Sequence, residues 1–222
     1  MKYLGYRFRD IARTLNPADI ASNLLYRMTH RLEYPVPPAY LRVRAIATSS
    51  LPAYLSTGLA NARGIRGVLE SNGVDANAIR SILDYGCGAG RIIRQLPEIF
   101  DNDVRIWGID RYGPAIRWCR RNLDFATFLQ SEQSSELEDK SVDLIFASSV
   151  FTHLSPETED RALRELLRLI RPAGSLLLTF RGKNYESRLS AKQLEILHRK
   201  GVLVRNPRAD GENECDAYHT PV

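Results

Sequence analysis

From residue 80 onward, short apolar runs alternate with amphipathic stretches along the chain. The runs have the length and composition of buried strands, and they predict strands at Arg80–Tyr85, Val104–Asp110, Phe125–Leu129, Ser141–Ser148 and Ser175–Phe180. The stretches between them have helical periodicity, and they predict helices at Arg91–Phe100, Gly113–Asn122 and about Pro156–Arg171. Strands that alternate with helices pair in parallel through right-handed crossovers, so the pattern predicts a doubly wound, mostly parallel α/β sheet.

The helix after the fourth strand has the clearest local signals. Ser155 is placed to cap it, Pro156 stands in its first turn, and Gly174 follows its end. We expect its sheet-facing side to consist of Leu163, Leu166, Leu167 and Ile170. Four arginines fall largely elsewhere around the helix and are predicted to be solvated, not to form a nucleic-acid stripe: Arg161, Arg164, Arg168 and Arg171.

The first 80 residues have a different pattern. Asn16–Pro17 opens a predicted helix whose apolar stripe consists of Ile20, Leu24, Met28 and Leu32. Tyr34–Pro38 breaks the pattern, and Ser50 and Pro52 begin a longer helix. We predict an N-terminal helical extension over 1–50 that packs on, or covers the active site of, a domain over 51–222 with its core at 80–181. Arg27 and Arg31 also suit a membrane-surface helix, but Asp19, Glu33 and the lack of a lysine-rich face speak against that alternative.

Composition narrows the class of protein. With 44% apolar and 26% charged residues the chain can build one ordinary core, and it contains no apolar run long enough for a membrane span. The N-terminus does not resemble a secretory signal, so a cytoplasmic protein is expected. Three cysteines without C-x-x-C spacing argue against a disulfide framework and against a metal site. The net charge of +5 originates in residues 1–80, which hold 11 Lys and Arg against 5 Asp and Glu.

A glycine-rich loop joins the first predicted strand to the next helix, at Leu83–Arg91. Gly86, Gly88 and Gly90 allow a tight turn and a close approach of the backbone to a ligand. A dinucleotide fingerprint would need a glycine where Arg91 stands, and no phosphate-loop lysine follows. This spacing speaks against the alternative of an NAD-dependent oxidoreductase.

Asp110 ends the second predicted strand, 22 residues after Gly88. A carboxylate at that point can accept hydrogen bonds from both hydroxyls of a ribose. The alternative is a helix cap or a turn acid. The distance from the glycine loop favours the ribose role.

Four segments in this order resemble the class I S-adenosylmethionine-dependent methyltransferases, a family with a Rossmann-like fold. They are Leu83–Arg91, Trp107–Ile116, Ser141–Leu154 and Leu169–Phe180. The V-F-T-H-L run within the third of them resembles a bacterial subgroup often found with sugar or natural-product pathways. The resemblance implies a methyl transfer to a small-molecule or glycan-type acceptor, with S-adenosylmethionine as cofactor.

The resemblance also implies roles for individual residues. Asp84 would hold the methionyl ammonium, Asp110 the ribose, and Arg111 or its neighbour would flank the adenine. The polar residues after the third strand, Ser131 and Glu132, match the family's adenine-facing position only loosely. The remaining implied cofactor residues are Tyr85, Gly86, Cys87, Gly88, Gly90 and Ser148.

His153 follows the fourth predicted strand and titrates near neutrality. Its functional interpretation is a base or orienting group for the acceptor, and its structural interpretation is a residue that ties the loop to the helix at Ser155. A nucleic-acid-binding protein that uses the basic N-terminal segment is a further alternative. The motif typical of amino-methylating nucleic-acid enzymes is missing, because Ser148-Ser149-Val150-Phe151 stands in its place.

The C-terminal stretch is too short for the family's complete sheet. Ser190–Lys200 predicts a helix, Gly201–Arg205 one extended piece, and Tyr218–Pro221 the start of a further helix, with Thr220 as its cap. We therefore expect about five parallel strands, with the last two strands of the family absent and Ser175–Phe180 at an edge. An apolar edge strand favours pairing, so a homodimer or a longer natural chain is expected.

Overall fold

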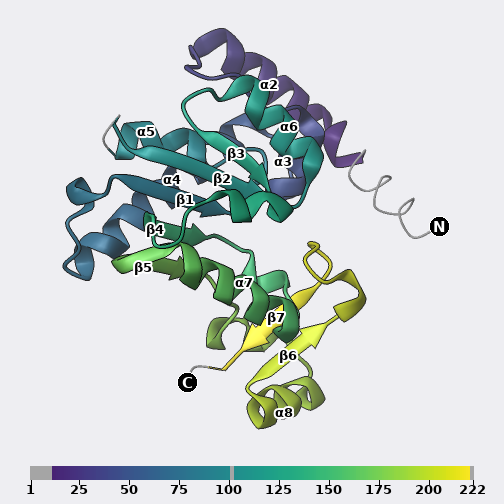
Figure 1. Cartoon of the computed structure of the whole chain (residues 1–222). Helices are drawn as coiled ribbons and strands as arrows, with labels where there is room; N and C mark the ends of the chain where they lie inside the picture. The colour runs from purple at the N-terminus through teal and green to yellow at the C-terminus, as the bar shows by residue number, and fades with distance from the viewer. Residues whose placement is uncertain (1–11, 101–102, 221–222) are drawn as a thin grey trace. The chain divides into compact units, whose positions relative to one another are not determined.

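The computed structural model describes residues 12–100 and 103–220, which fall into two units divided between Ser135 and Glu136 (Figure 1). The first unit holds three parallel strands in the order β3-β2-β1: β1 is Ser81–Tyr85, β2 is Arg105–Asp110 and β3 is Thr127–Gln130. Helix α6, Gly113–Asn122, leads from β2 to β3 with the predicted bounds. Helices that precede β1 include α2, Pro17–Thr29, α3, Ala39–Ile46, and α4, Leu51–Ser71.

In the second unit, β4 (Val142–Ala147) and β5 (Ile170–Leu178) pair in parallel and are joined by α7, Pro156–Leu169. Helix α8, Ala191–Lys200, has a capping box made by Ser190 and Gln193, and it leads to β6, Val202–Arg205. Strand β7, Asp216–His219, pairs antiparallel with β6 in a separate two-stranded sheet. Five parallel strands interleaved with helices confirm the predicted doubly wound α/β class.

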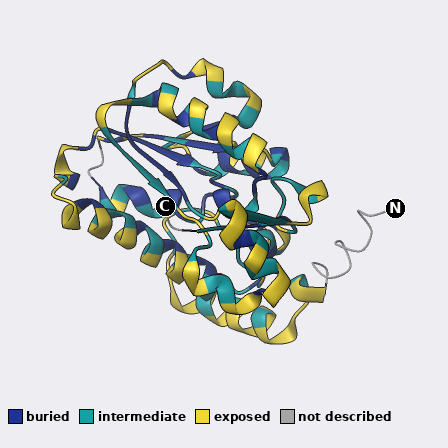
Figure 2. Ribbon diagram, turned by 90° about the horizontal axis from the view of Figure 1, so that it is seen from below, coloured by how far each residue is buried: buried dark blue, intermediate teal, exposed yellow. Residues whose placement is uncertain are grey.

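The remaining elements are short. Helix α5 is Leu96–Ile99. Single 3₁₀ turns are η1 Ala76–Ala78, η2 Ile93–Gln95, η3 Ser131–Glu136, η4 Phe151–His153, η5 Lys183–Arg188 and η6 Pro207–Ala209. The dark blue of Figure 2 follows some of the strands: every residue of β4 and all but the last of β1 are buried, whereas no residue of β5 or β6 is. Strands β1 and β4 therefore contribute most to the core, and the ends of the strands carry the candidate site.

Three predicted elements differ from the structure. The helix expected at Arg91–Phe100 is a 3₁₀ turn followed by the four residues of α5, because Pro97 lacks an N–H and cannot continue a helix that began upstream. Strand β5 begins at Ile170, where its pairing with β4 has a register shift, and not at Ser175. Strand β3 begins at Thr127 and not at Phe125.

The C-terminal prediction was wrong in one respect. Tyr218 and His219 belong to β7 and do not begin a helix, because Tyr218 pairs with Leu203 of β6 and is buried. The backbone N–H of Thr220 donates to the Gly201 carbonyl at 3.0 Å, so its role there is in a turn. Pro221 lies outside the described residues. Within residues 103–220 no further strand pairs with β5, as expected, and β6 and β7 pair with each other.

Two predicted packing faces also differ. Leu166 is buried as expected, but Leu167, also expected on the packed side of α7, is 62% exposed, and Ala162 and Leu169 are buried in its place. The apolar stripe of α2 faces solvent, and none of the residues of that helix is buried. The described part of the N-terminal segment is therefore helical, and α3 buries Leu41 and Val43, but α2 does not pack through its apolar side.

Gly58 of α4 lies against the glycine loop, and this position permits a clear stability prediction. A Cβ on Gly58 would stand 2.2 Å from the Arg91 carbonyl oxygen, whereas one on Gly64 of the same helix would have no atom within 4 Å. We expect Gly58→Ala to lower the free energy of unfolding by about 1–3 kcal/mol through overpacking. Gly64→Ala should raise it by roughly 0.5–1 kcal/mol, as is usual in a helix. Urea denaturation measures both, and a stabilised Gly58→Ala would contradict the packing described here.

Candidate functional site

The glycine loop folds back onto the end of β2. The N–H groups of Gly86 and Cys87 both donate to the Ile109 carbonyl, at 2.7 and 3.0 Å. Gly86, Gly88 and Gly90 have φ values of 88°, 54° and 74°, in the left-handed region that favours glycine. The loop is thus held in place by β2 and not by its own side chains.

Gly88 and Gly90 differ in what surrounds their missing Cβ atoms. A Cβ on Gly90 would meet Leu123 at 2.7 Å and Ile93 at 3.1 Å, so this glycine serves the packing of the loop against its own unit. A Cβ on Gly88 would have no atom within 4 Å. Gly88 therefore borders open space at the end of β1, where a ligand of an open α/β sheet binds.

Asp110 joins the glycine loop to the turn after β2. Its Oδ2 accepts from the Gly88 N–H at 2.8 Å, and its Oδ1 accepts from the Tyr112 N–H at 2.7 Å. Each carboxylate oxygen has further acceptor capacity, because an ionised carboxylate offers about four lone-pair positions. Asp110 is therefore already oriented by two backbone groups and can still accept from a pair of ribose hydroxyls.

Asp84, one residue before the end of β1, is 2% exposed. Its Oδ2 has no hydrogen-bond partner among the described residues. Burial raises the pKa of Asp84 to about 8; Asp110 acts in the same direction and Arg91 against it. A buried carboxyl oxygen without a partner fits a cationic group such as the ammonium of a methionyl moiety. Together with the open space at Gly88, it fits S-adenosylmethionine.

Cys87, within the same loop, is not prepared for nucleophilic chemistry. Burial raises the pKa of its thiol well above the usual value, and the buried Cys119 thiol acts in the same direction. The nucleophilic form of cysteine is the thiolate, which these surroundings disfavour. The small side chain is instead accommodated by Gly108, whose added Cβ would stand 2.9 Å from the Cys87 sulfur.

The other predicted cofactor residues of the first unit differ in how far their side chains are buried. Tyr85 and Ser131 are half-buried, whereas Arg111 and Glu132 are exposed. Ser131 begins η3 directly after β3, so the chain does place it at the same strand ends as Asp110. Their contacts with a cofactor stay predictions.

Tyr54 was missed by the sequence analysis. This residue of α4 is fully buried, and its hydroxyl donates to the Ala89 carbonyl of the glycine loop at 2.8 Å. The i, i+4 spacing with Gly58 and Ala62 could have revealed the buried side of α4. The bond to a loop 35 residues away depends on tertiary structure, which periodicity does not contain.

The second unit carries Ser148 and His153. Ser148 directly follows β4 and is half-buried. Nδ1 of His153 lies 2.6 Å from the Cys215 carbonyl, and since a carbonyl only accepts, Nδ1 carries the proton and Nε2 a lone pair. Burial lowers the pKa of His153, and Arg181 acts in the same direction, while the Cys215 hydrogen bond, Asp216 and Glu214 oppose it. The neutral ring is both tied to the C-terminal segment and able to accept a proton.

Asp210 was also missed, and it fixes the start of α7. Its carboxylate accepts from the Ser155 N–H at 2.6 Å and from the hydroxyls of Ser155 and Thr158 at 2.7 and 2.6 Å. The N–H of Gly211 donates to the His153 carbonyl at 2.8 Å. The segment after β6 therefore holds the loop that contains His153, as well as its ring.

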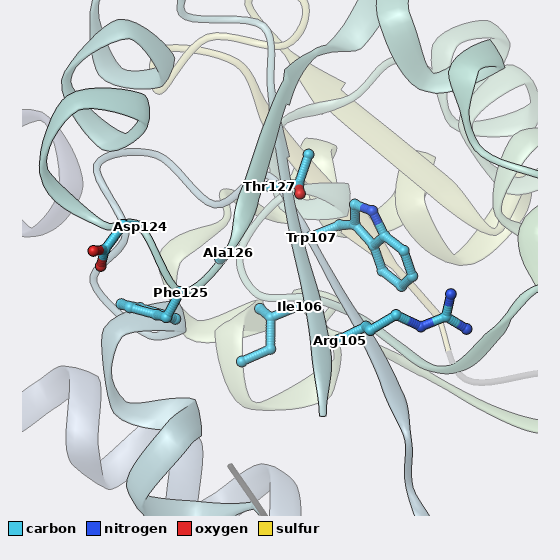
Figure 3. Close-up of a pocket in the computed structure, with 7 residues that line it drawn as sticks. All are labelled: Arg105, Ile106, Trp107, Asp124, Phe125, Ala126 and Thr127. Carbon is cyan, nitrogen blue, oxygen red and sulfur yellow. The ribbon is translucent and has the colours of Figure 1, made fainter. Parts of the chain in front are cut away.

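A hollow of about 190 Å³ lies at the opposite ends of β2 and β3 (Figure 3). It is lined by Arg105, Ile106, Trp107, Asp124, Phe125, Ala126 and Thr127. These residues precede or begin their strands, whereas ligands of open α/β sheets bind at the carboxyl ends. The hollow is not part of the cofactor site.

Comparison with known proteins assigns the middle part of the chain to a family. Residues 83–178 match the family described as "Methyltransferase domain", and the matched segment begins within β1 and ends with β5. These residues form a methyltransferase domain. The predicted class, an S-adenosylmethionine-dependent methyltransferase with S-adenosylmethionine as its cofactor, is thereby confirmed for these matched residues.

Relatives of this methyltransferase domain act on different acceptors. The tRNA N(3)-methylcytidine methyltransferase of Schizosaccharomyces pombe is 32% identical over 128 residues, covering 53% of this chain and 42% of that protein. The trans-aconitate 2-methyltransferase of an Azoarcus species is 30% identical over 133 residues, covering 60% of this chain and 50% of that protein. The chain thus spans half or less of the length of these relatives.

The solved structures that resemble this chain include a TehB-like SAM-dependent methyltransferase from Corynebacterium glutamicum. It is 20% identical, with a TM-score of 0.42, and the match covers 73% of this chain and 97% of that one.

Proposed function

We propose that this chain transfers the methyl group of S-adenosylmethionine to a small-molecule or glycan-type acceptor in the cytoplasm. The observation that carries the proposal is the buried Asp84 carboxyl with an unpartnered oxygen, at the same strand end as the open space of Gly88. Asp84 would hold the cofactor ammonium and Asp110 the ribose. Bound cofactor supplies an activated methyl group on a sulfonium, and the chain supplies alignment and a water-poor site.

His153 would serve the acceptor. Bound cofactor would supply the methyl group from its sulfonium, and Nε2 of His153 would accept the proton that the acceptor atom loses. The hydrogen bond from Nδ1 to the Cys215 carbonyl orients the ring and fixes this protonation pattern. The lowered pKa keeps the imidazole neutral, and so able to act as a base, at pH 7.

The acceptor class rests on charge. In the second unit, three of the four arginines in α7 and at the start of β5 pair with acidic side chains: Arg164 with Asp160, Arg168 with Asp139 and Glu165, and Arg171 of β5 with Asp143. The fourth, Arg161, donates to the Thr158 hydroxyl. A phosphate backbone would find no unpaired row of cations along α7, so this helix gives no support to a nucleic-acid acceptor.

We expect His153→Ala to lower kcat about 10²–10⁴-fold while cofactor affinity stays unchanged, because general base catalysis contributes in this range. In the parent protein kcat should fall as the pH drops through the His153 pKa. His198→Ala is the control, since His198 of α8 is exposed. A lower melting temperature with normal turnover in His153→Ala would instead assign His153 a structural role only.

The acceptor is found by incubation of the chain with methyl-labelled S-adenosylmethionine and fractionated extract. We expect label in a small-molecule or glycan fraction. Label in the RNA fraction, with binding that weakens steeply with salt, would contradict the proposed acceptor class and favour a nucleic-acid enzyme. We also propose that the chain forms a homodimer through β5. A measurement of its molecular mass in solution tests this.

A further inference from the structure

Helix α2 turns its polar side toward the protein and its apolar side toward solvent. Asp19 Oδ2 accepts from the Thr48 hydroxyl at 2.7 Å and from the Ser49 N–H and hydroxyl at 3.0 and 2.9 Å. One turn further, Asn23 donates to the Ser49 carbonyl at 3.0 Å and accepts from the Leu51 N–H at 2.5 Å. These contacts fix the rotation of the helix and leave its apolar face outward.

That face is contiguous. At about 100° per residue, Ile20, Leu24 and Met28 lie along one line of the helix and Leu25 beside it, roughly opposite Asp19 and Asn23. Their exposed fractions are 51% for Ile20, 62% for Leu24, 62% for Leu25 and 76% for Met28. Scattered exposed apolar residues are ordinary, but a contiguous apolar helix face on a protein surface marks an interaction site.

The exposed charges around this face are mostly basic. Arg13, Arg27 and Arg31 are exposed, and none of them makes an ion pair with any residue in 12–100 or 103–220. Of the two acids that speak against a membrane-surface helix in the sequence, Glu33 is exposed beyond the end of α2, and Asp19 is turned inward. Burial acts to raise its pKa, but the hydrogen bonds from Thr48 and Ser49 outweigh burial and lower it.

We propose that α2 docks the protein on an anionic lipid surface, with Ile20, Leu24, Leu25 and Met28 between the headgroups and Arg27 and Arg31 near the lipid phosphates. An apolar face with arginines at its edge is the arrangement of an interfacial helix. Such a helix lies in the plane of the surface, and no helix within the described part of the chain is long and apolar enough to cross a membrane. A second copy of the chain fits this face less well, since it would bring more arginines and no exposed acid of α2. The docking does not depend on the methyl transfer.

The test is cosedimentation of the full chain with vesicles of phosphatidylcholine, with and without phosphatidylglycerol. We expect binding to the anionic vesicles that weakens in high salt and is much lower with phosphatidylcholine alone. Replacing Arg27 and Arg31 by Glu should weaken binding at least about fivefold per arginine. The double variant Leu24→Glu, Met28→Glu should weaken it more than about tenfold.

Leu167→Glu is the matched control, because Leu167 of α7 is as exposed as Leu24 but lies on another element; its vesicle binding should equal that of the parent. Melting temperatures show whether each variant folds. Titration of the parent protein with the two kinds of vesicle tests the lipid docking without relying on any variant. The proposal is overturned if the parent protein binds neither vesicle, or if Leu24→Glu, Met28→Glu binds as well as the parent. A parent dimer that this double variant dissociates, without vesicle binding, would show that α2 joins two copies.

Discussion

Asp84→Asn should make the free protein more stable at pH 7 while it weakens cofactor binding. The pKa of Asp84 is about 8 in the folded protein and near 3.8 when unfolded, so between these values the folded state retains a proton that the unfolded state releases. The free energy of unfolding therefore falls as pH rises through this window. An amide at this position does not titrate, and we expect a gain of roughly 2 kcal/mol at pH 7.

The same substitution should weaken cofactor binding, although it stabilises the free protein. In the parent protein, the ammonium of S-adenosylhomocysteine pairs with ionised Asp84, so affinity should increase as pH rises from 6 to 8, by up to about tenfold per unit. Asp84→Asn should bind at least about tenfold more weakly at pH 8 and lose this pH dependence. Denaturation and calorimetry measure the two effects. The exposed Asp124, at the opposite strand ends, supplies the control Asp124→Asn, which should change neither. A destabilised Asp84→Asn with normal affinity would contradict both assignments.

Asp110→Ala should weaken S-adenosylhomocysteine binding by about a hundredfold or more. A hydrogen bond to a charged group contributes roughly 1.5–3 kcal/mol, and Asp110 is placed to accept from two ribose hydroxyls. The substitution also frees the Gly88 and Tyr112 N–H groups that orient the carboxylate.

An analogue without the two ribose hydroxyls separates these causes. Such an analogue should bind the parent protein weakly, and Asp110→Ala should weaken it only a little further. If the substitution reduces the affinities of both ligands by the same factor, Asp110 acts only by shaping the loop.

Capping residues and hydrophobic periodicity predicted those elements whose ends are determined by residues nearby in the sequence. Helix α6 has the predicted bounds, and Ser155 caps α7 as its sequence indicates. Pairing between distant segments was harder to predict. Nothing within Asp216–His219 indicates that it pairs with Val202–Arg205, and Pro97 interrupts a helix that periodicity alone would extend.

The orientation of α2 illustrates a further limit. Periodicity shows which residues share a face of a helix, but it does not show which face packs. Here the hydrogen bonds of Asp19 and Asn23 to Thr48–Leu51 decide the orientation, and these partners are nearly 30 residues away. The candidate site follows the same rule: the glycine loop and Asp110 were predictable from spacing, whereas the contact of Tyr54 with that loop and the contact of Asp210 with the start of α7 depend on tertiary structure.

Calorimetric titration of the chain with S-adenosylhomocysteine, and separately with NAD, tests the central claim most directly. We expect one binding site for S-adenosylhomocysteine, no heat of binding with NAD, and loss of the S-adenosylhomocysteine signal in Asp110→Ala. Binding of NAD in place of S-adenosylhomocysteine, or full affinity for S-adenosylhomocysteine in Asp110→Ala, would contradict the account of the site.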